Sequence, residues 1–188
     1  MQATQPGHTM HDDGAALANR AMGAMIFFVF GAIWLEAWAR QTGAGWPRHA
    51  AIAVAALVLL VLAWRRFRRH AAARAREGAT PERRRIDRLF HIVNAVTWTV
   101  IVVAGNVLAN TGHGAWMIPM AIFVLGLHFL PLAHIFRNPP HYVTGAALLA
   151  LALLYPLLAR GGPSDPVGFL GAGLVLWLSA LWALRGRA

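Results

Sequence analysis

Residues 115–142 read AWMIPMAIFVLGLHFLPLAHIFRNPPHY, and this stretch decides the fold class. It is long and apolar enough to cross a membrane, yet it contains His128, His134, Pro119 and Pro131. An imidazole in lipid without a partner costs several kcal/mol, and an internal proline frees a backbone carbonyl that a neighbour must satisfy. The stretch therefore predicts a membrane helix packed among other protein helices.

Five further apolar runs supply these neighbours. Only 13% of the residues are charged, about half the share of a soluble domain, and the charges cluster between the runs. The predicted spans are residues 21–39, 46–64, 89–109, 115–136, 142–159 and 167–184. We expect an all-α polytopic integral membrane protein, a six-transmembrane-helix bundle. Its membrane domain, residues 21–188, follows a polar cytoplasmic tail, residues 1–20, without regular structure.

The basic residues indicate how the bundle is oriented. All 17 are arginine, and they flank the spans, which argues against nucleic acid as a partner. If the loop at residues 65–88 is cytoplasmic, fourteen arginines lie on that side and only Arg40, Arg48 and Arg160 lie outside. This bias predicts a multi-pass protein of the bacterial inner membrane with both termini in the cytoplasm.

The basic loop has features of its own. Its first part favours a helical extension, and Thr80 and Pro81 then suit the N-cap and first position of a second short helix. Arginines beside an anionic leaflet predict binding of anionic lipid at residues 65–88. Because six short helices make a thin bundle, we also consider a homo-oligomer.

The third span carries a polar stripe. On an ideal helix these side chains fall within an arc of about 160°, with Thr97 about 60° beyond its edge. The stripe consists of His91, Asn94, Thr99, Asn106 and Asn110. Such a stripe indicates either hydrogen bonding between helices or the wall of a hydrated pathway.

The histidines of the third to fifth spans lie at two depths. His91, His134 and His141 fall near the cytoplasmic face, whereas His128 lies about 12 Å deeper, level with Thr97. The first three are candidate ligands of a metal or a haem, or else interfacial side chains. We predict that His128 faces the bundle interior.

The third span provides the polar environment that His128 needs. Pro131 leaves the carbonyl of Leu127 without its usual amide donor. Asn94 or Thr97 can satisfy either that carbonyl or the imidazole of His128. Water reaching the ring would then allow it to relay protons.

Glu36 is the carboxylate within an apolar run. Arg40 follows it by four residues, in the favourable order for an ion pair. The alternative interpretation places Glu36 at the outer mouth of a polar route with Asn106, Asn110 and His113.

The sequence indicates the function less directly than it indicates the fold. The chain has no cysteine, and no nucleophile and base are arranged as in an enzyme, so catalysis is not favoured. We expect a small transporter or channel-like component for a proton, ion or small solute, with the third and fourth spans as its centre. The alternative is a non-transporting subunit that binds haem or metal, or an accessory factor that uses its basic loop. No cofactor is specified.

Overall fold

The computed structural model describes residues 7–76 and 80–185 and is all-helical there. The helices are α1 (Gly7–Gln41), α2 (Trp46–Arg76), α3 (Pro81–Asn110), α4 (Met117–Ile135), α5 (Pro140–Leu158) and α6 (Val167–Arg185), with short 3₁₀ turns at Gly114–Trp116 and Gly162–Ser164. All six α-helices are long and apolar enough to cross a membrane. The six predicted spans are therefore confirmed as six helices.

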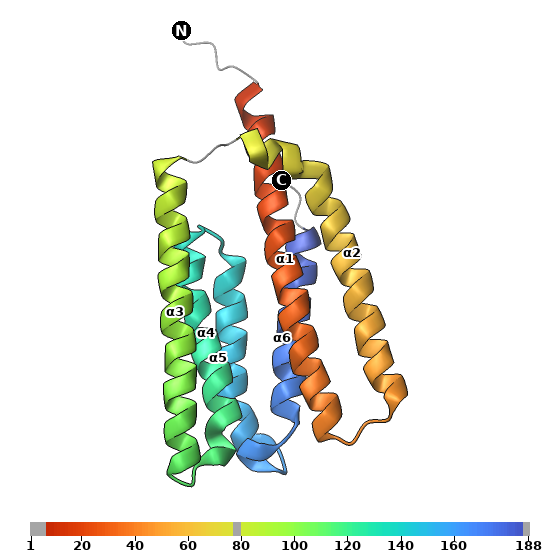
Figure 1. The fold of residues 1–188 in the computed structure, drawn as a ribbon, viewed down its shortest axis with the longest axis vertical. Coiled ribbons are helices and arrows are strands. Elements are labelled where there is room, and N and C mark those ends of the chain that lie inside the picture. Colours follow the sequence, from red (N-terminus) through yellow and green to blue (C-terminus); the bar gives the residue numbers. More distant parts are fainter. Residues whose placement is uncertain (1–6, 77–79, 186–188) are drawn as a thin grey trace.

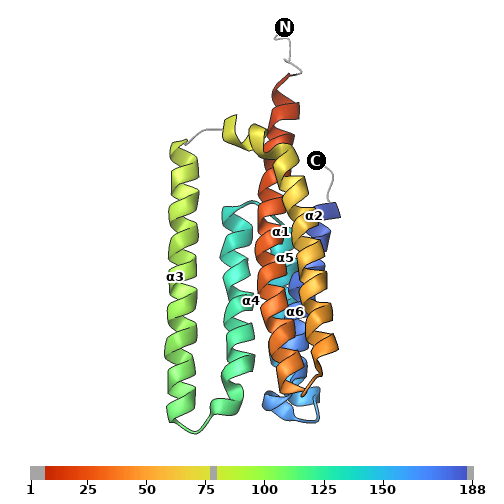
Figure 2. The same ribbon diagram turned by 45° about the vertical axis from the view of Figure 1, so that its right-hand side comes forward.

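The helices run up and down side by side in two sets (Figure 1). One set has α1 packed along α2 and α6, and the other has α4 packed along α3 and α5. Packing of α5 against α6 joins the sets, so that α2 and α3 are outermost (Figure 2). The first turns of α1 and the last turns of α6 lie at the end of the bundle where α2 ends and α3 begins. We call this the basic end.

Glycines allow the closest helix contacts. The indole of Trp177 on α6 donates a hydrogen bond of 3.0 Å to the carbonyl of Phe28 on α1. A methyl group at Gly31 would collide with that indole. Between α4 and α5, a Cβ on Gly145 would lie 2.9 Å from the carbonyl oxygen of Gly126. Because glycine has no Cβ, these helices can approach each other this closely.

The lack of regular structure expected for residues 1–20 is wrong for residues 7–20, because α1 begins at Gly7; residues 1–6 lie outside the described residues. This extension has a packing partner that the hydropathy of the tail did not reveal. A Cβ on Gly14 would lie 2.9 Å from Cβ of Ala73, on the part of α2 beyond its apolar run, and Ala15 and Ala18 are fully buried. Two helical extensions thus cover each other.

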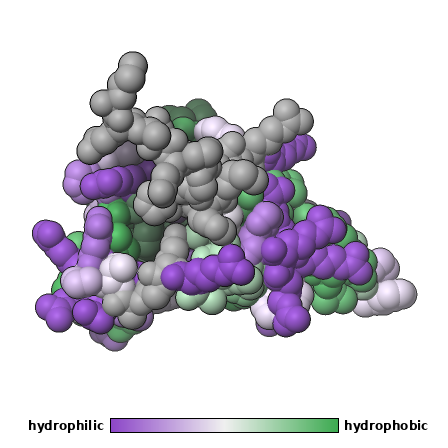
Figure 3. All heavy atoms as spheres, turned by 90° about the horizontal axis from the view of Figure 1, so that it is seen from above, coloured by the Kyte–Doolittle hydropathy of each residue, from purple (hydrophilic) through white to green (hydrophobic). Residues whose placement is uncertain are grey.

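The helices flanking the basic loop behave largely as expected. α2 continues as a helix to Arg76, and the Thr80 hydroxyl accepts a hydrogen bond of 3.2 Å from the amide of Arg83, which confirms the predicted N-cap. The short second helix is wrong, since α3 runs unbroken from Pro81 to Asn110. Viewed onto the basic end, many hydrophilic side chains are visible on either side, with apolar side chains between and behind them (Figure 3).

Candidate functional site

The contact between α3 and α4 contains a hydrogen bond between side chains. Thr97 on α3 is buried, and its hydroxyl oxygen lies 2.9 Å from Nδ1 of His128 on α4. The same hydroxyl donates to the carbonyl of Val93, one turn earlier, at 2.8 Å. The expected polar contact between the third span and His128 is therefore present, and Thr97 makes it.

These two contacts favour one tautomer of His128. A hydroxyl group has one hydrogen, and that hydrogen is used in the bond to the Val93 carbonyl. The contact to His128 is then a hydrogen bond only if Nδ1 carries the hydrogen and donates it. In the neutral ring this leaves the lone pair on Nε2, which has no hydrogen-bond partner among the described residues.

A second histidine lies close to His128. His141, at the start of α5, and His128 both flank Phe129, with ring-centroid distances of 5.8 and 5.5 Å. Phe27 of α1 completes this group, with its ring centroid 5.7 Å from that of His141. The two histidines therefore lie where α1, α4 and α5 meet, and Thr97 adds α3. We call these five residues the histidine junction.

Local backbone structure positions His141. α4 ends in a Schellman motif, in which the amide of Asn138 bonds to the carbonyl of Ala133 at 2.9 Å and Arg137 adopts a left-handed φ of 47°. Pro140 then opens α5 at a position that needs no amide donor. The side-chain nitrogen Nδ2 of Asn138 lies 3.3 Å from Nδ1 of His141 and holds the ring.

Most of the predicted polar stripe on α3 lies elsewhere. Asn94 donates to the carbonyl of Phe90, one turn earlier on the same helix, at 3.0 Å and does not reach His128. Exposed stripe residues are His91, Thr99, Asn106 and Asn110. Among the long helices, α3 packs closely only along α4, so these exposed side chains lie away from that contact. The interpretation of the stripe as the wall of a hydrated pathway stays a prediction.

The candidate metal ligands are not brought together. His91 and His134 are exposed, whereas His141 is partly buried in the histidine junction. Within residues 7–76 and 80–185, no three His, Cys, Asp or Glu side chains are grouped closely enough to hold a metal ion. The helices that carry these three histidines therefore do not bring their side chains together.

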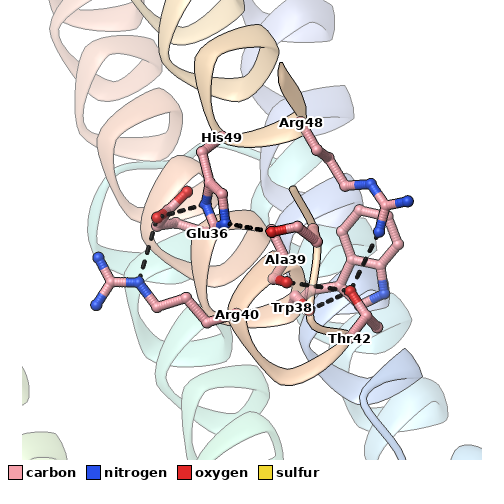
Figure 4. Close-up of polar contacts among 8 residues, drawn as sticks. Glu36, Trp38, Ala39, Arg40, Thr42, Arg48 and His49 are labelled. Atoms are coloured by element: carbon pink, nitrogen blue, oxygen red, sulfur yellow. Dashed lines mark hydrogen bonds and ion pairs between the residues drawn. The ribbon is translucent and has the colours of Figure 1, made fainter. Parts of the chain in front are cut away.

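Glu36 lies at the opposite end of the bundle, beside the turn between α1 and α2 (Figure 4). Its Oε1 accepts from Nε of Arg40 at 3.2 Å, as the spacing of four residues predicts, and lies 2.8 Å from Nδ1 of His49. Asn106 and Asn110 bond to each other on α3 instead. The expected pair with Arg40 is confirmed.

His49 was not singled out from the sequence. Its Nε2 lies 3.2 Å from the carbonyl oxygen of Ala44, so both ring nitrogens face acceptors. A neutral ring can donate to only one of Glu36 and Ala44, whereas an imidazolium can donate to both. The signal available in the sequence is the short link between Arg40 and Trp46, which brings the start of α2 level with Glu36.

Comparison of the chain with protein-family models, curated proteins and solved structures finds no match. Function is therefore inferred from the side chains themselves. The histidine junction offers a nitrogen lone pair, a second imidazole and an aromatic lining inside a membrane-type bundle. This chemistry suits the acceptance and release of a proton, or the binding of a small solute.

Proposed function

We propose that the protein is a small membrane transporter or channel-like component that handles a proton or a small solute. α3 and α4 form its functional centre, and His128 is the residue that accepts and releases the proton. The observation that carries the proposal is the hydrogen bond of 2.9 Å between Thr97 and His128. It fixes the ring and leaves Nε2 as the acceptor.

Two features of the surroundings support this role. Polar side chains within membrane helices are costly, and they commonly mark ion or substrate pathways. His128 and His141 also lie at a meeting point of the two sets of helices, which Phe27 of α1 reaches from the other set. Relative movement of the sets would change the surroundings of both imidazoles, as alternating access requires.

A purely structural role for the contact predicts different behaviour. A hydrogen bond between membrane helices contributes only about 0.6 kcal/mol on average. If His128 only stabilised packing, replacing it with phenylalanine would change the stability slightly and leave transport intact. Under our proposal, the same change abolishes proton movement in a folded protein.

The orientation belongs to the same proposal. Both described ends of the chain lie at the basic end. The arginine bias supports a cytoplasmic basic end, with the protein as a multi-pass component of the bacterial inner membrane. Glu36 and His49 then lie at the outer surface.

The test is proton flux into vesicles. Purified protein is reconstituted into liposomes containing a pH-sensitive dye, and a pH step is applied with valinomycin to collapse the electrical potential. We expect flux from the wild type, none from His128→Phe, and reduced flux from Thr97→Val. His70→Phe makes the same replacement on the α2 extension and is expected to leave flux unchanged. Circular dichroism verifies that each variant is folded.

Two other outcomes would argue against this proposal. Equal flux from wild type and folded His128→Phe contradicts the role of His128. A Soret band in the purified wild-type protein would instead support the alternative of a haem-binding subunit.

A further inference from the structure

A shallow depression runs along the first turns of α3. It is lined by Arg84, Asp87, Arg88, His91, Ile92 and Ala95. These positions recur at intervals of three or four residues, so they share one side of the helix. One continuous stripe of α3 therefore forms the depression.

This stripe lies on the side of α3 that faces away from the bundle. Phe90 and Val93 pack against the core cluster, and Thr97 contacts α4. Helical spacing places these residues on roughly the opposite side from Arg88 and Ala95. In a bilayer, the depression therefore opens toward lipid.

The chemistry of the depression changes along its length. Arg84 and Arg88 lie before the apolar run of α3, whereas Ile92, which is 52% exposed, and Ala95 lie within it. The distance from Arg84 to Ala95 along the helix is about 16 Å. A charged headgroup region followed by the first part of an acyl chain has this order of polarity.

We propose that this stripe binds one anionic phospholipid molecule. Arg84 and Arg88 hold its phosphate, because guanidinium groups pair with phosphate through two parallel hydrogen bonds. An acyl chain lies over Ile92 and the small side chain of Ala95. Asp87 opposes the two arginines with a single carboxylate, so the lining keeps a net positive charge. This inference does not depend on the transport proposal.

The test measures retained lipid. The full chain is placed in nanodiscs of phosphatidylcholine with a minor fraction of phosphatidylglycerol. Native mass spectrometry then measures the mass of the protein together with the lipid that stays bound. We expect phosphatidylglycerol to be enriched on the wild type. The double variant Arg84→Gln/Arg88→Gln should lose this enrichment, because it removes both guanidinium groups that pair with the phosphate.

Two matched variants separate a site from general attraction to charge. Arg65→Gln/Arg69→Gln removes the same charge from exposed positions of α2 and should retain the enrichment. Ala95→Trp keeps every charge but fills the apolar part of the depression and should reduce it. Equal losses in the two arginine variants, or full enrichment in Ala95→Trp, would overturn the proposal.

Discussion

Arg137 has a strained backbone conformation that helps to position His141. Its φ of 47° belongs to the left-handed region, which costs a residue with a Cβ about 1–2 kcal/mol. In return, the Schellman motif turns the chain from α4 into α5 and places His141 against Phe129, the residue that follows His128. Glycine is the usual residue at this position of the motif.

The first prediction concerns this strain. Arg137→Gly should raise the free energy of unfolding by about 1 kcal/mol, because glycine adopts the left-handed region without a steric penalty. Arg137→Ala removes the same side chain but keeps a Cβ, so it should give no such gain. Unfolding by SDS in mixed micelles measures both, and equal stabilities of the two variants would show that φ is not the cause.

Single residues were predictable where one helix determines the geometry. Glu36 and Arg40 follow from spacing on one helix, as does the N-cap Thr80. The contact of Thr97 with His128 followed from matched depth on antiparallel helices. His49 was missed because its partners belong to the preceding helix and turn, which spacing within its own helix does not specify.

Between elements, the α1–α6 contact shows how tightly two helices depend on a glycine. At Gly31 there is no room for a methyl group beside Trp177, whose indole bonds to the backbone of α1. At Gly23, on the same helix, a Cβ would meet no neighbouring atom within 4 Å. Geometry therefore distinguishes two glycines that look alike in sequence.

The second prediction follows from this difference. Gly31→Ala should destabilise the protein by about 1–3 kcal/mol, because the added methyl forces the helices apart. Gly23→Ala should be neutral or stabilising by up to about 1 kcal/mol, because alanine favours the helix. Chemical unfolding of both variants in detergent checks this, and similar losses in the two would contradict the close contact.

The loop between α5 and α6 provides a third prediction, on pH. Asp165 accepts hydrogen bonds from the amides of Val167 and Gly161 at 2.9 and 3.0 Å, and these bonds lower the pKa of its carboxyl from its ordinary value. A lowered pKa stabilises the fold above the unfolded value, and this contribution is lost as pH falls through the folded value.

Asp165→Asn should therefore melt at a lower temperature than wild type at pH 6, and the difference should shrink as pH falls below about 4. Thermal unfolding in detergent across this range measures it. A difference that stays constant down to the lowest pH would show that the carboxylate charge contributes nothing.

At the scale of whole helices, the sequence predicted where the helices lie. It did not predict which side of each helix faces its neighbours. Length and hydropathy identify a span, and α3 ends within a residue of its expected bound. The side of α3 that meets α4 depends on which helices become its neighbours. Because α3 is outermost, His91 and Asn106 lie on its exposed side and Thr97 faces inward.

The whole molecule combines two sets of three helices with an asymmetric distribution of charge. The basic end contains both described ends of the chain, the arginine-rich end of α2 and the arginine-rich start of α3. Hydropathy predicted the number of helices. The extension of α1 could not be predicted in this way, because it depends on packing against the distant extension of α2.

The fourth prediction concerns orientation. Reporter fusions at Arg20, at Asn138 and after Arg187 should report the cytoplasm, because arginines concentrate on that side. Fusions at Gly43, Gly112 and Ser164 should report the outside. Arginine pairs inserted at Gly43 and Ser164 add positive charge to the proposed outer side, and so test whether the arginine distribution determines the orientation. A cytoplasmic signal at Gly112 or Ser164 in the unaltered chain would contradict the proposed orientation.

The role proposed for His128 requires that its ring faces α3 inside the bundle, against Thr97. The chain has no cysteine, so pairs can be introduced without background. With a short bifunctional thiol reagent in native membranes, the pair Thr97→Cys/His128→Cys should cross-link. The control pair Thr99→Cys/His128→Cys should not, because position 99 lies about 200° further round α3. Cross-linking of the control alone, or of both pairs equally, would contradict the account.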